Sequence, residues 1–199
     1  MKIVILDGTH KKDGMTTTLV RKFIDGVISI KPDTEVKTFD LLSEKIKFCL
    51  GCGHCVDQKS PDNVPCVIND DVENIKKEAL HCDILVFASP IYEYAVSSSM
   101  KRFLERCLTL VTFKMGPASK IKPIKGKKGV IICSSGAPFP FNHLMGITRY
   151  PRFILKLGCK LFGCAEIKKI MAGGMAINEK FKNRWETKAF QLGIKFAKN

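Results

Sequence analysis

Short apolar segments alternate along the chain with segments of helical periodicity. The first of them, Lys2–Asp7, is rich in isoleucine and valine and is followed at once by a glycine, which is typical of a buried parallel strand. Four later segments have similar strand character. The expected strands are therefore Lys2–Asp7, Glu35–Asp40, 83–89, 129–134 and 166–172. Because helical segments separate them, we predict a parallel sheet with helices on both faces.

Start and stop signals bound the helices expected between these strands. A helical pattern begins at Thr16 and is ended by a Pro-Asp pair. Asp70 and Glu73 have the spacing of a capping box, which predicts the start of another helix. Further helices are expected over residues 97–109 and 143–161. The last helix has one apolar face, made by Phe181, Trp185, Ala189, Leu192 and Phe196.

The order of these elements indicates a fold class. A chain of 199 residues without internal repeats or linkers suits one domain, so we assign 1–199 to a single domain with a cysteine-rich loop at about 48–68. Five alternating strands are compatible with an α/β flavodoxin-like three-layer sandwich, a five-stranded parallel sheet of order 2-1-3-4-5. Ligands then bind beyond the carboxyl ends of the strands, where the strand order reverses. The loops after Asp7, Ser89 and Ser134 are therefore the candidate site.

Composition narrows the class of protein. No stretch reaches the 18 or so apolar residues of a membrane span, and the apolar start is too short for a secretory signal, so we expect a cytoplasmic protein and no membrane partner. In a reducing cytosol, nine cysteines should remain thiols or bind metal. The net charge of +14 suits nucleic acid, but the lysines are scattered and no binding motif is present, so no nucleic-acid partner is expected. A basic surface also suits pyridine nucleotides.

The loop after the first strand has the residues of a phosphate cradle. Residues 8–18 combine two glycines with several threonines at a helix start, where free N–H groups and the helix dipole attract an anion. A P-loop would need a lysine where Met15 stands, and the dinucleotide fingerprint a glycine where His10 stands. The loop should therefore hold a phosphate without cleaving it. An ordinary β–α turn with a threonine cap is the alternative, and the absence of a G-x-S-x-G motif disfavours a hydrolase.

Four cysteines form a second candidate site. Cys49, Cys52 and Cys55 have the spacing C-x2-C-x2-C, which brings three thiols onto one tight loop as a [4Fe–4S] cluster requires, and ten residues separate Cys55 from Cys66. Structural zinc sites usually pair two separated C-x2-C elements, which disfavours zinc. Thiols without metal are the remaining alternative. The other cysteines lie in or beside apolar segments and should be small buried hydrophobes: Cys82, Cys107, Cys133, Cys159 and Cys164.

Three local matches make the chain resemble the NADPH-dependent FMN reductase family of the flavodoxin-like superfamily. The family's first loop reads like G-S-x-R-x-x-G-x-T, and the matching region here, with a lysine near the usual arginine, holds Gly8, Thr9, Lys11, Gly14 and Thr16. Residues 89–92 match the family's S-P-x-Y. The cysteine segment resembles one found in many members and in the related iron–sulfur flavoproteins. Threonine for serine at position 9 and histidine for proline at position 10 are departures from the family pattern.

The resemblance implies an FMN-dependent oxidoreductase that passes electrons from NAD(P)H to a small acceptor such as a quinone or a flavin. The alternatives are an FMN plus [4Fe–4S] electron carrier and a flavin-free binding domain. No catalytic side chain is assigned, and a homodimer or higher homo-oligomer is implied. The residues expected to hold FMN are Thr9, Lys11, Gly14, Met15, Thr16, Thr17, Pro90, Ile91, Tyr92, Glu93, Tyr94, Ser134, Ser135 and Gly136.

A lysine-rich segment, residues 114–128, precedes the fourth expected strand. Its charge could steer NAD(P)H or an acidic redox partner over a screening length of about 8–10 Å at physiological salt. Neutralising Lys125, Lys127 and Lys128 is then expected to flatten the salt dependence of hydride transfer. A solvated surface loop is the alternative interpretation.

Overall fold

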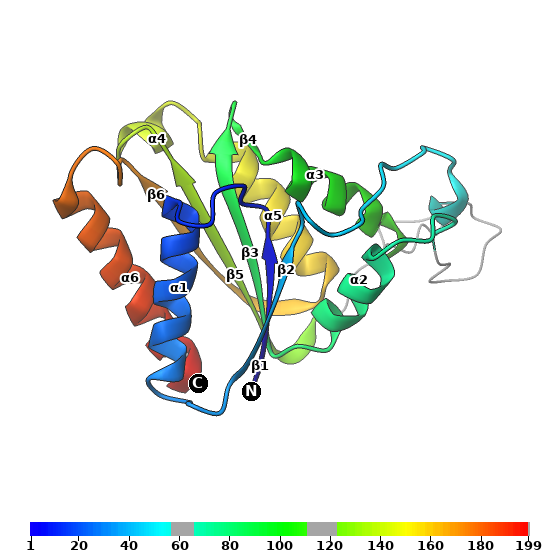
Figure 1. Ribbon diagram of the computed structural model, residues 1–199, viewed down its shortest axis with the longest axis horizontal. Helices are drawn as coiled ribbons and strands as arrows, with labels where there is room; N and C mark the ends of the chain where they lie inside the picture. The colour runs from blue at the N-terminus through cyan, green and yellow to red at the C-terminus, as the bar shows by residue number, and fades with distance from the viewer. Residues whose placement is uncertain (57–65, 111–122, 199) are drawn as a thin grey trace.

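A twisted parallel sheet forms the centre of the protein (Figure 1). The structure is a computed structural model that describes residues 1–56, 66–110 and 123–198. The strands are β1 (Lys2–Asp7), β2 (Glu35–Asp40), β3 (Ile84–Tyr92), β4 (Ala95–Val96), β5 (Ile124–Ser135) and β6 (Cys164–Gly173). They have the order β2-β1-β3-β5-β6, all parallel, and the two-residue β4 pairs antiparallel with the end of β3. The predicted order 2-1-3-4-5 is confirmed once the short β4 is set aside.

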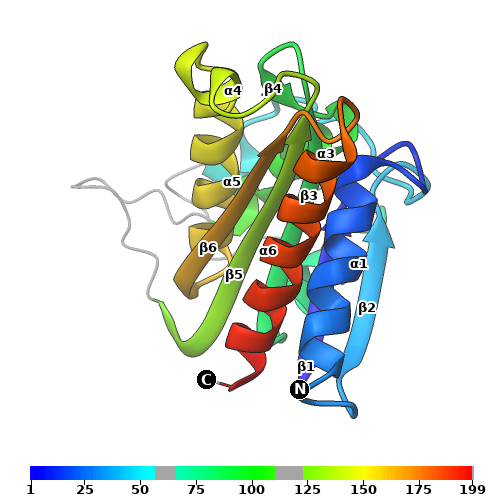
Figure 2. The ribbon, with the colours of Figure 1, turned by 90° about the vertical axis from the view of Figure 1, so that its left-hand side faces the viewer.

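Helices cover both faces of this sheet. They are α1 (Met15–Ile28), α2 (Val72–Leu80), α3 (Ser98–Glu105), α4 (Phe141–Leu144), α5 (Arg149–Leu161) and α6 (Glu179–Lys198), with 3₁₀ turns η1 (His54–Val56) and η2 (Arg106–Leu110). Figure 2 shows α1 and α6 side by side on one face and α5 on the other. None of the helices within the described ranges is long and apolar enough to cross a membrane.

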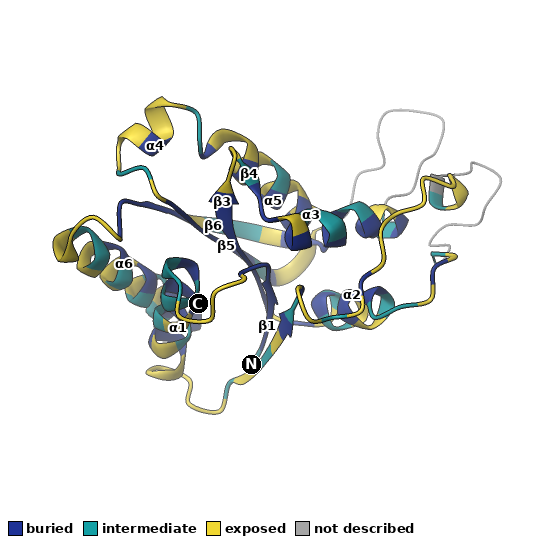
Figure 3. Cartoon of the chain, turned by 45° about the horizontal axis from the view of Figure 1, so that its top comes forward, coloured by how far each residue is buried: buried dark blue, intermediate teal, exposed yellow. Residues whose placement is uncertain are grey.

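Each strand sends alternate side chains to opposite faces, which produces two cores. Val4 and Leu6 of β1 pack toward α2, α3 and α5, whereas Ile3 and Ile5 pack toward α1 and α6. The five cysteines expected to be buried all lie inside or beside these cores. In Figure 3 the strands are mostly buried, and exposed residues lie on the outer sides of the helices and on the loops.

Helices α1 and α6 approach each other at two glycines. A Cβ added to Gly26 would lie 2.1 Å from the carbonyl oxygen of Phe190, and one added to Gly193 would lie 2.1 Å from that of Phe23. No side chain fits in either place, so the two helix backbones are in direct contact. Together, α1 and α6 cover one face of the sheet.

Two sequence expectations about helices are wrong. The capping box at Asp70 does not form: Asp71 is the N-cap residue of α2 and caps no N–H with its side chain, while the Asp70 carboxylate accepts from the N–H of Val72 and from Arg106. The helix expected over 143–161 is two helices, because Gly146 between them has a φ of +74°, outside the right-handed helical region. The strands expected at 83–89, 129–134 and 166–172 are each longer than predicted.

The lysine-rich segment also differs from its expectation. Lys114, Lys120 and Lys122 lie outside the described residues. Lys127 is 3% exposed and donates hydrogen bonds to the carbonyl oxygens of Ala79 and Leu80 at the end of α2. Lys128 donates to the carbonyl oxygen of Phe196. Both lysines lie at the amino end of β5, opposite the carboxyl ends of the strands, so their role in steering is not supported.

Candidate functional site

The loops that follow β1, β3 and β5 enclose a cavity of about 270 Å³ at the carboxyl ends of these strands. It lies where the strand order reverses, as expected for a doubly wound sheet. The lining contains every residue predicted for the cofactor except Thr17, Glu93 and Tyr94. It consists of Thr9, His10, Lys11, Asp13, Gly14, Met15, Thr16, Pro90, Ile91, Tyr92, Ser134, Ser135, Gly136 and Ala176.

One end of this loop cavity is the start of α1. Gly14 is the N-cap residue in an extended conformation, no side chain caps the helix, and its first turn has no acidic residue. The first N–H groups of the helix therefore lack the side-chain acceptor that a serine or aspartate cap would supply. Such a helix start suits an anion, because its N–H groups and its dipole both favour negative charge.

Hydroxyl groups surround this helix start. The hydroxyl of Thr16 is buried and lies 2.7 Å from the hydroxyl of Ser134, which joins the first loop to the third. The hydroxyl of Thr9 lies 3.2 Å from that of Thr17, and Thr17 donates to the carbonyl oxygen of Lys11. Thr17 is thus next to the cavity although it does not line it. Each hydroxyl can turn its proton toward a bound phosphate.

The second loop forms the far side of the cavity. Glu93 and Tyr94 have φ values of +45° and +61° and make the tight turn between β3 and β4. Two successive non-glycine residues with positive φ are strained, which is common at ligand sites. They line an adjoining cavity of about 170 Å³ that shares Ile91, Ser135 and Gly136 with the first. The three loops therefore bound two connected spaces.

Several lining residues were not expected from the sequence. His10 and Asp13 lie in the predicted loop but were left out of the predicted set. Ile147 lines the smaller cavity, and Ala176 comes from the loop after β6. The Gly-Gly pair at the end of β6 was the available signal for Ala176, because the loop that it begins leaves the same edge of the sheet.

The cysteine segment lies on the flank of the sheet, beyond α2 and η2, and away from the loop cavity (Figures 1 and 3). Cys49 and Cys52 are exposed, and Cys55 and Cys66 are partly buried. Burial raises the pKa of Cys55, and so do the nearby thiols of Cys49, Cys66 and Cys52. Cys55 is thus within electrostatic reach of the other three thiols. Over the ranges given above, no three His, Cys, Asp or Glu side chains are arranged to hold a single metal ion.

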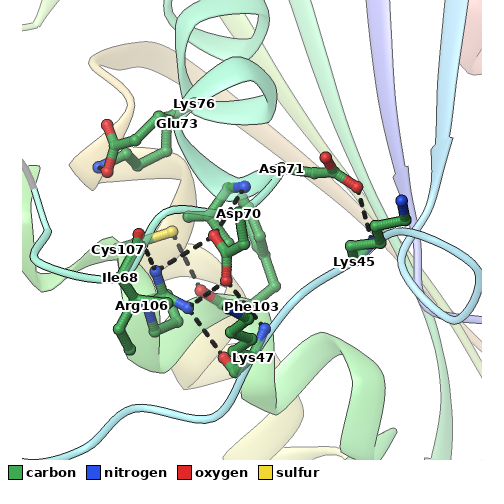
Figure 4. Close-up of polar contacts among 11 residues, drawn as sticks. Lys45, Lys47, Ile68, Asp70, Asp71, Glu73, Lys76, Phe103, Arg106 and Cys107 are labelled. Carbon is green, nitrogen blue, oxygen red and sulfur yellow. Dashed lines mark hydrogen bonds and ion pairs between the residues drawn. The ribbon is translucent and has the colours of Figure 1, made fainter.

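A buried ion pair holds the base of this segment (Figure 4). The side chains of Arg106 and Asp70 are 0% and 1% exposed, and their closest atoms, Nη1 and Oδ2, are 2.6 Å apart. Arg106 also donates to the carbonyl oxygens of Lys47 and Ile68, while the N–H of Lys47 donates to Asp70. Residues 47 and 68 flank the four cysteines. The guanidinium of Arg106 thus joins the residues just before the cysteine segment to those just after it.

The pKa values of this pair reflect their contact. Burial raises the pKa of Asp70. Hydrogen bonds from Arg106 and from the N–H groups of Lys47 and Val72 lower this pKa by more, so it lies below its ordinary value. Burial lowers the pKa of Arg106, and the hydrogen bond and charge of Asp70 more than offset this effect. Both groups are therefore charged at neutral pH. The Cys66 thiol also contributes to the raised pKa of Arg106, which places that sulfur near the guanidinium.

Comparison with known proteins is consistent with this geometry. The chain belongs to the flavodoxin-like fold family, which matches residues 1–191. An iron–sulfur flavoprotein of Archaeoglobus fulgidus is 26% identical over 198 residues, covering 93% of this chain and 82% of the relative. An FMN-dependent NADH:quinone oxidoreductase of Methylorubrum extorquens is 25% identical over 189 residues, covering 92% and 93%.

Solved structures share the fold at lower identity. The NAD(P)H:quinone oxidoreductase of Methanothermobacter marburgensis has a TM-score of 0.74 at 18% identity, covering 98% of this chain and 96% of that one. An azoreductase of Bacillus anthracis has a TM-score of 0.76 at 12% identity, covering 98% and 99%. At these identities the likeness concerns the fold.

Proposed function

We propose that the protein is an FMN-dependent oxidoreductase that passes electrons from NAD(P)H to a small acceptor such as a quinone or a flavin. The observation that carries this proposal is the uncapped start of α1, which opens into a cavity between three loops. Relatives at 25–26% identity that are named for FMN or for flavin support it.

The phosphate of FMN fits the first loop. The N–H groups at the start of α1 and the hydroxyls of Thr9, Thr16 and Thr17 would donate to it, and Lys11 adds a positive charge at the rim. No acidic residue occupies the first turn of the helix, although Asp13 lines the cavity just before it. Hydrogen bonds to a charged group contribute roughly 1.5–3 kcal/mol each.

The flavin ring fits between the second and third loops. Residues 90–94 would run along one edge of the ring, where residues 91–94 would present backbone N–H groups, and Ser134, Ser135 and Gly136 would close the other side. Bound FMN would supply the chemistry, accepting a hydride from NAD(P)H and giving electrons to an acceptor. The protein's part is to orient the ring and leave one face open, so no side chain is needed as an acid or base.

The test uses the whole chain and two ligands, FMN and riboflavin. The purified protein should show flavin absorption and release FMN on denaturation. After removal of the flavin, FMN should bind at least about tenfold more tightly than riboflavin, which lacks the phosphate. Equal binding of the two would refute the phosphate cradle, and a flavin-free protein that binds neither would refute the proposed function.

A second candidate is an FMN protein that also carries a [4Fe–4S] cluster. The proximity of Cys55 to the other three thiols and the iron–sulfur flavoprotein relatives favour it. The donor set fits, because such clusters are held by four thiolates, and Cys49, Cys52, Cys55 and Cys66 would hold it. The glycines at 51 and 53, with φ of +64° and +75°, let the segment bend around a centre.

Anaerobic purification with iron and sulfide assays tests this candidate. About four irons per chain, lost in Cys52→Ser and retained in Cys82→Ala, would support the cluster. Cys82 is the matched control because it is buried at the start of β3, outside the cysteine segment. Zinc in place of iron, or metal-free thiols with normal FMN binding, would reject the cluster and leave the first proposal intact.

A further inference from the structure

A second cavity of about 1150 Å³, more than four times the volume of the loop cavity, runs along the outer edge of β6. Residues 167–170 of β6 all line it. Successive residues of a strand point to opposite faces, so a cavity lined by four in a row must wrap around the edge of the sheet. Helix α5 forms one wall and α6 the other, on opposite faces of the sheet (Figure 2). We call this space the edge groove.

The walls of the edge groove are strongly basic. Arg149, Arg152 and Lys156 follow one another at helical spacing along α5, and Lys188 and Lys195 do so along α6. No residue that lines the groove is acidic. None of these five cations forms an ion pair with an acidic residue of the described chain.

The strand adds two more cations. Lys168 pairs with Glu166 at 3.3 Å, but Lys169 has no such partner in the described chain. Burial, then the charges of Arg152 and Lys156, lower the pKa of Lys169 below its ordinary value. The cations of α5 and β6 are therefore close enough to repel one another. An anionic occupant would relieve this repulsion.

The aliphatic lining of the edge groove and the unpaired side of β6 indicate what kind of anion fits. Aliphatic residues, among them Ile131, Ile167, Ile170 and Leu192, line the groove between the cations. Strand β6 pairs with β5 on one side, and among the described strands none pairs with its other side. A free strand edge offers backbone N–H and C=O groups to an added strand. The groove thus combines apolar contacts, main-chain pairing and positive charge.

We propose that the edge groove binds an acidic partner protein, which adds an extended, carboxylate-rich segment to the free edge of β6. Four strand residues span about 13 Å, and residues 149–156 of α5 span about 11 Å, so the groove takes a short segment. Carboxylates on either face of that segment would meet cations from α5 or α6. A second copy of this chain is disfavoured, because its net charge is also +14. The proposal goes beyond the proposed function.

The position of the groove relates it to the loop cavity. Gly146 and Arg149 both line the edge groove. Ile147, which lies between them in the sequence, lines the smaller of the two loop cavities. A protein docked in the edge groove therefore lies beside the loop cavity. This position would bring the partner next to a flavin bound there.

The test measures binding of a labelled peptide and does not depend on flavin. The probe is a fluorescein-labelled peptide of about twelve residues built from Glu-Glu-Val-Val repeats, which place carboxylates on both faces of the extended peptide, and it exceeds the groove at roughly 3.3 Å per residue. Its anisotropy is followed with the full-length protein at low and at physiological salt. One matched peptide carries glutamine for glutamate, and another carries N-methyl groups on all residues, which removes the backbone donors from both edges of the peptide.

Two charge-reversed proteins complete the design. Arg152→Glu/Lys169→Glu reverses charge inside the groove, and Lys31→Glu/Lys180→Glu makes the same change in net charge at exposed positions outside it. We expect the groove variant to lose at least about tenfold in affinity and the control to lose little. The glutamine and N-methyl peptides should both bind weakly. FMN content and NAD(P)H oxidation, measured separately, should be unchanged in both variants.

Three results would overturn the inference. Equal loss in the two variants would show attraction to the overall charge rather than to the groove. Tighter binding of a single-stranded oligonucleotide, lost in the groove variant, would assign the groove to nucleic acid. Displacement of the peptide by NADP⁺ would assign it to a dinucleotide. A failure of FMN binding, by contrast, would affect the proposed function and leave peptide binding as it is.

Discussion

The loop cavity and the cysteine segment both follow the carboxyl ends of strands, but they are held in different ways. The walls of the loop cavity are tied to each other by their own polar side chains, such as Thr16 and Ser134. The cysteine segment is tied at its base by Arg106 and Asp70, while Cys49 and Cys52 are exposed. The first site is thus shaped before its ligand arrives. The second is fixed at its ends by one buried ion pair, and two of its cysteines are open to solvent.

The largest expected effect tests the base of the cysteine segment. Arg106→Met leaves the buried carboxylate of Asp70 without its cation, which should cost about 3–5 kcal/mol in the free energy of unfolding. Urea unfolding measures this loss. Arg102→Met is the matched control, because Arg102 donates to the carbonyl oxygen of Leu41 and forms no buried ion pair. Similar losses in the two variants would contradict the special role of Arg106.

The next effect concerns the loop cavity. Thr16→Ala/Thr17→Ala removes two hydroxyls beside the start of α1, so affinity for FMN should fall at least about tenfold. Thr34→Ala, whose hydroxyl bonds to the carbonyl oxygen of Lys31 at the other end of the sheet, should keep normal affinity. Fluorescence titration of the flavin-free protein measures both. Unchanged affinity in the double variant would place the phosphate elsewhere.

A smaller effect concerns Lys127, at the end of the sheet opposite the loop cavity. Lys127→Met leaves two carbonyl oxygens at the end of α2 without a donor, which should cost about 1–3 kcal/mol of stability. The salt dependence of NAD(P)H oxidation should stay as in the wild type, because Lys127 is buried far from the loop cavity. Stopped-flow kinetics at several salt concentrations check this. A flattened salt dependence would restore the steering role expected from the sequence.

The smallest effect tests the strained turn after β3. Glu93 has a positive φ, so Glu93→Gly should stabilise the protein by about 1 kcal/mol relative to Glu93→Ala, which keeps the Cβ. The comparison removes the same carboxylate in both variants. Thermal unfolding measures the difference. Equal stability of the two would show that the turn carries no strain.

Sequence alone predicted the fold and most of the loop cavity, because both depend on local patterns. Strand periodicity and the glycine and threonine positions of the first loop are visible within short windows. The role of Arg106 was not visible, since its partners at 70 and 47 lie 36 and 59 residues away. The edge groove was hidden for the same reason. Its cations come from three separate elements, and only the strand order shows that β6 is an edge.

The direct contact between the backbones of α1 and α6 has a consequence for synthesis of the chain. About 150 residues separate the end of α1 from the start of α6. At roughly 5–20 residues per second, a ribosome needs about 8–30 s to cover that distance. During this time the side of α1 that contacts α6 has no helix beside it. Folding of this face of the sheet is therefore completed only after translation has reached the last helix.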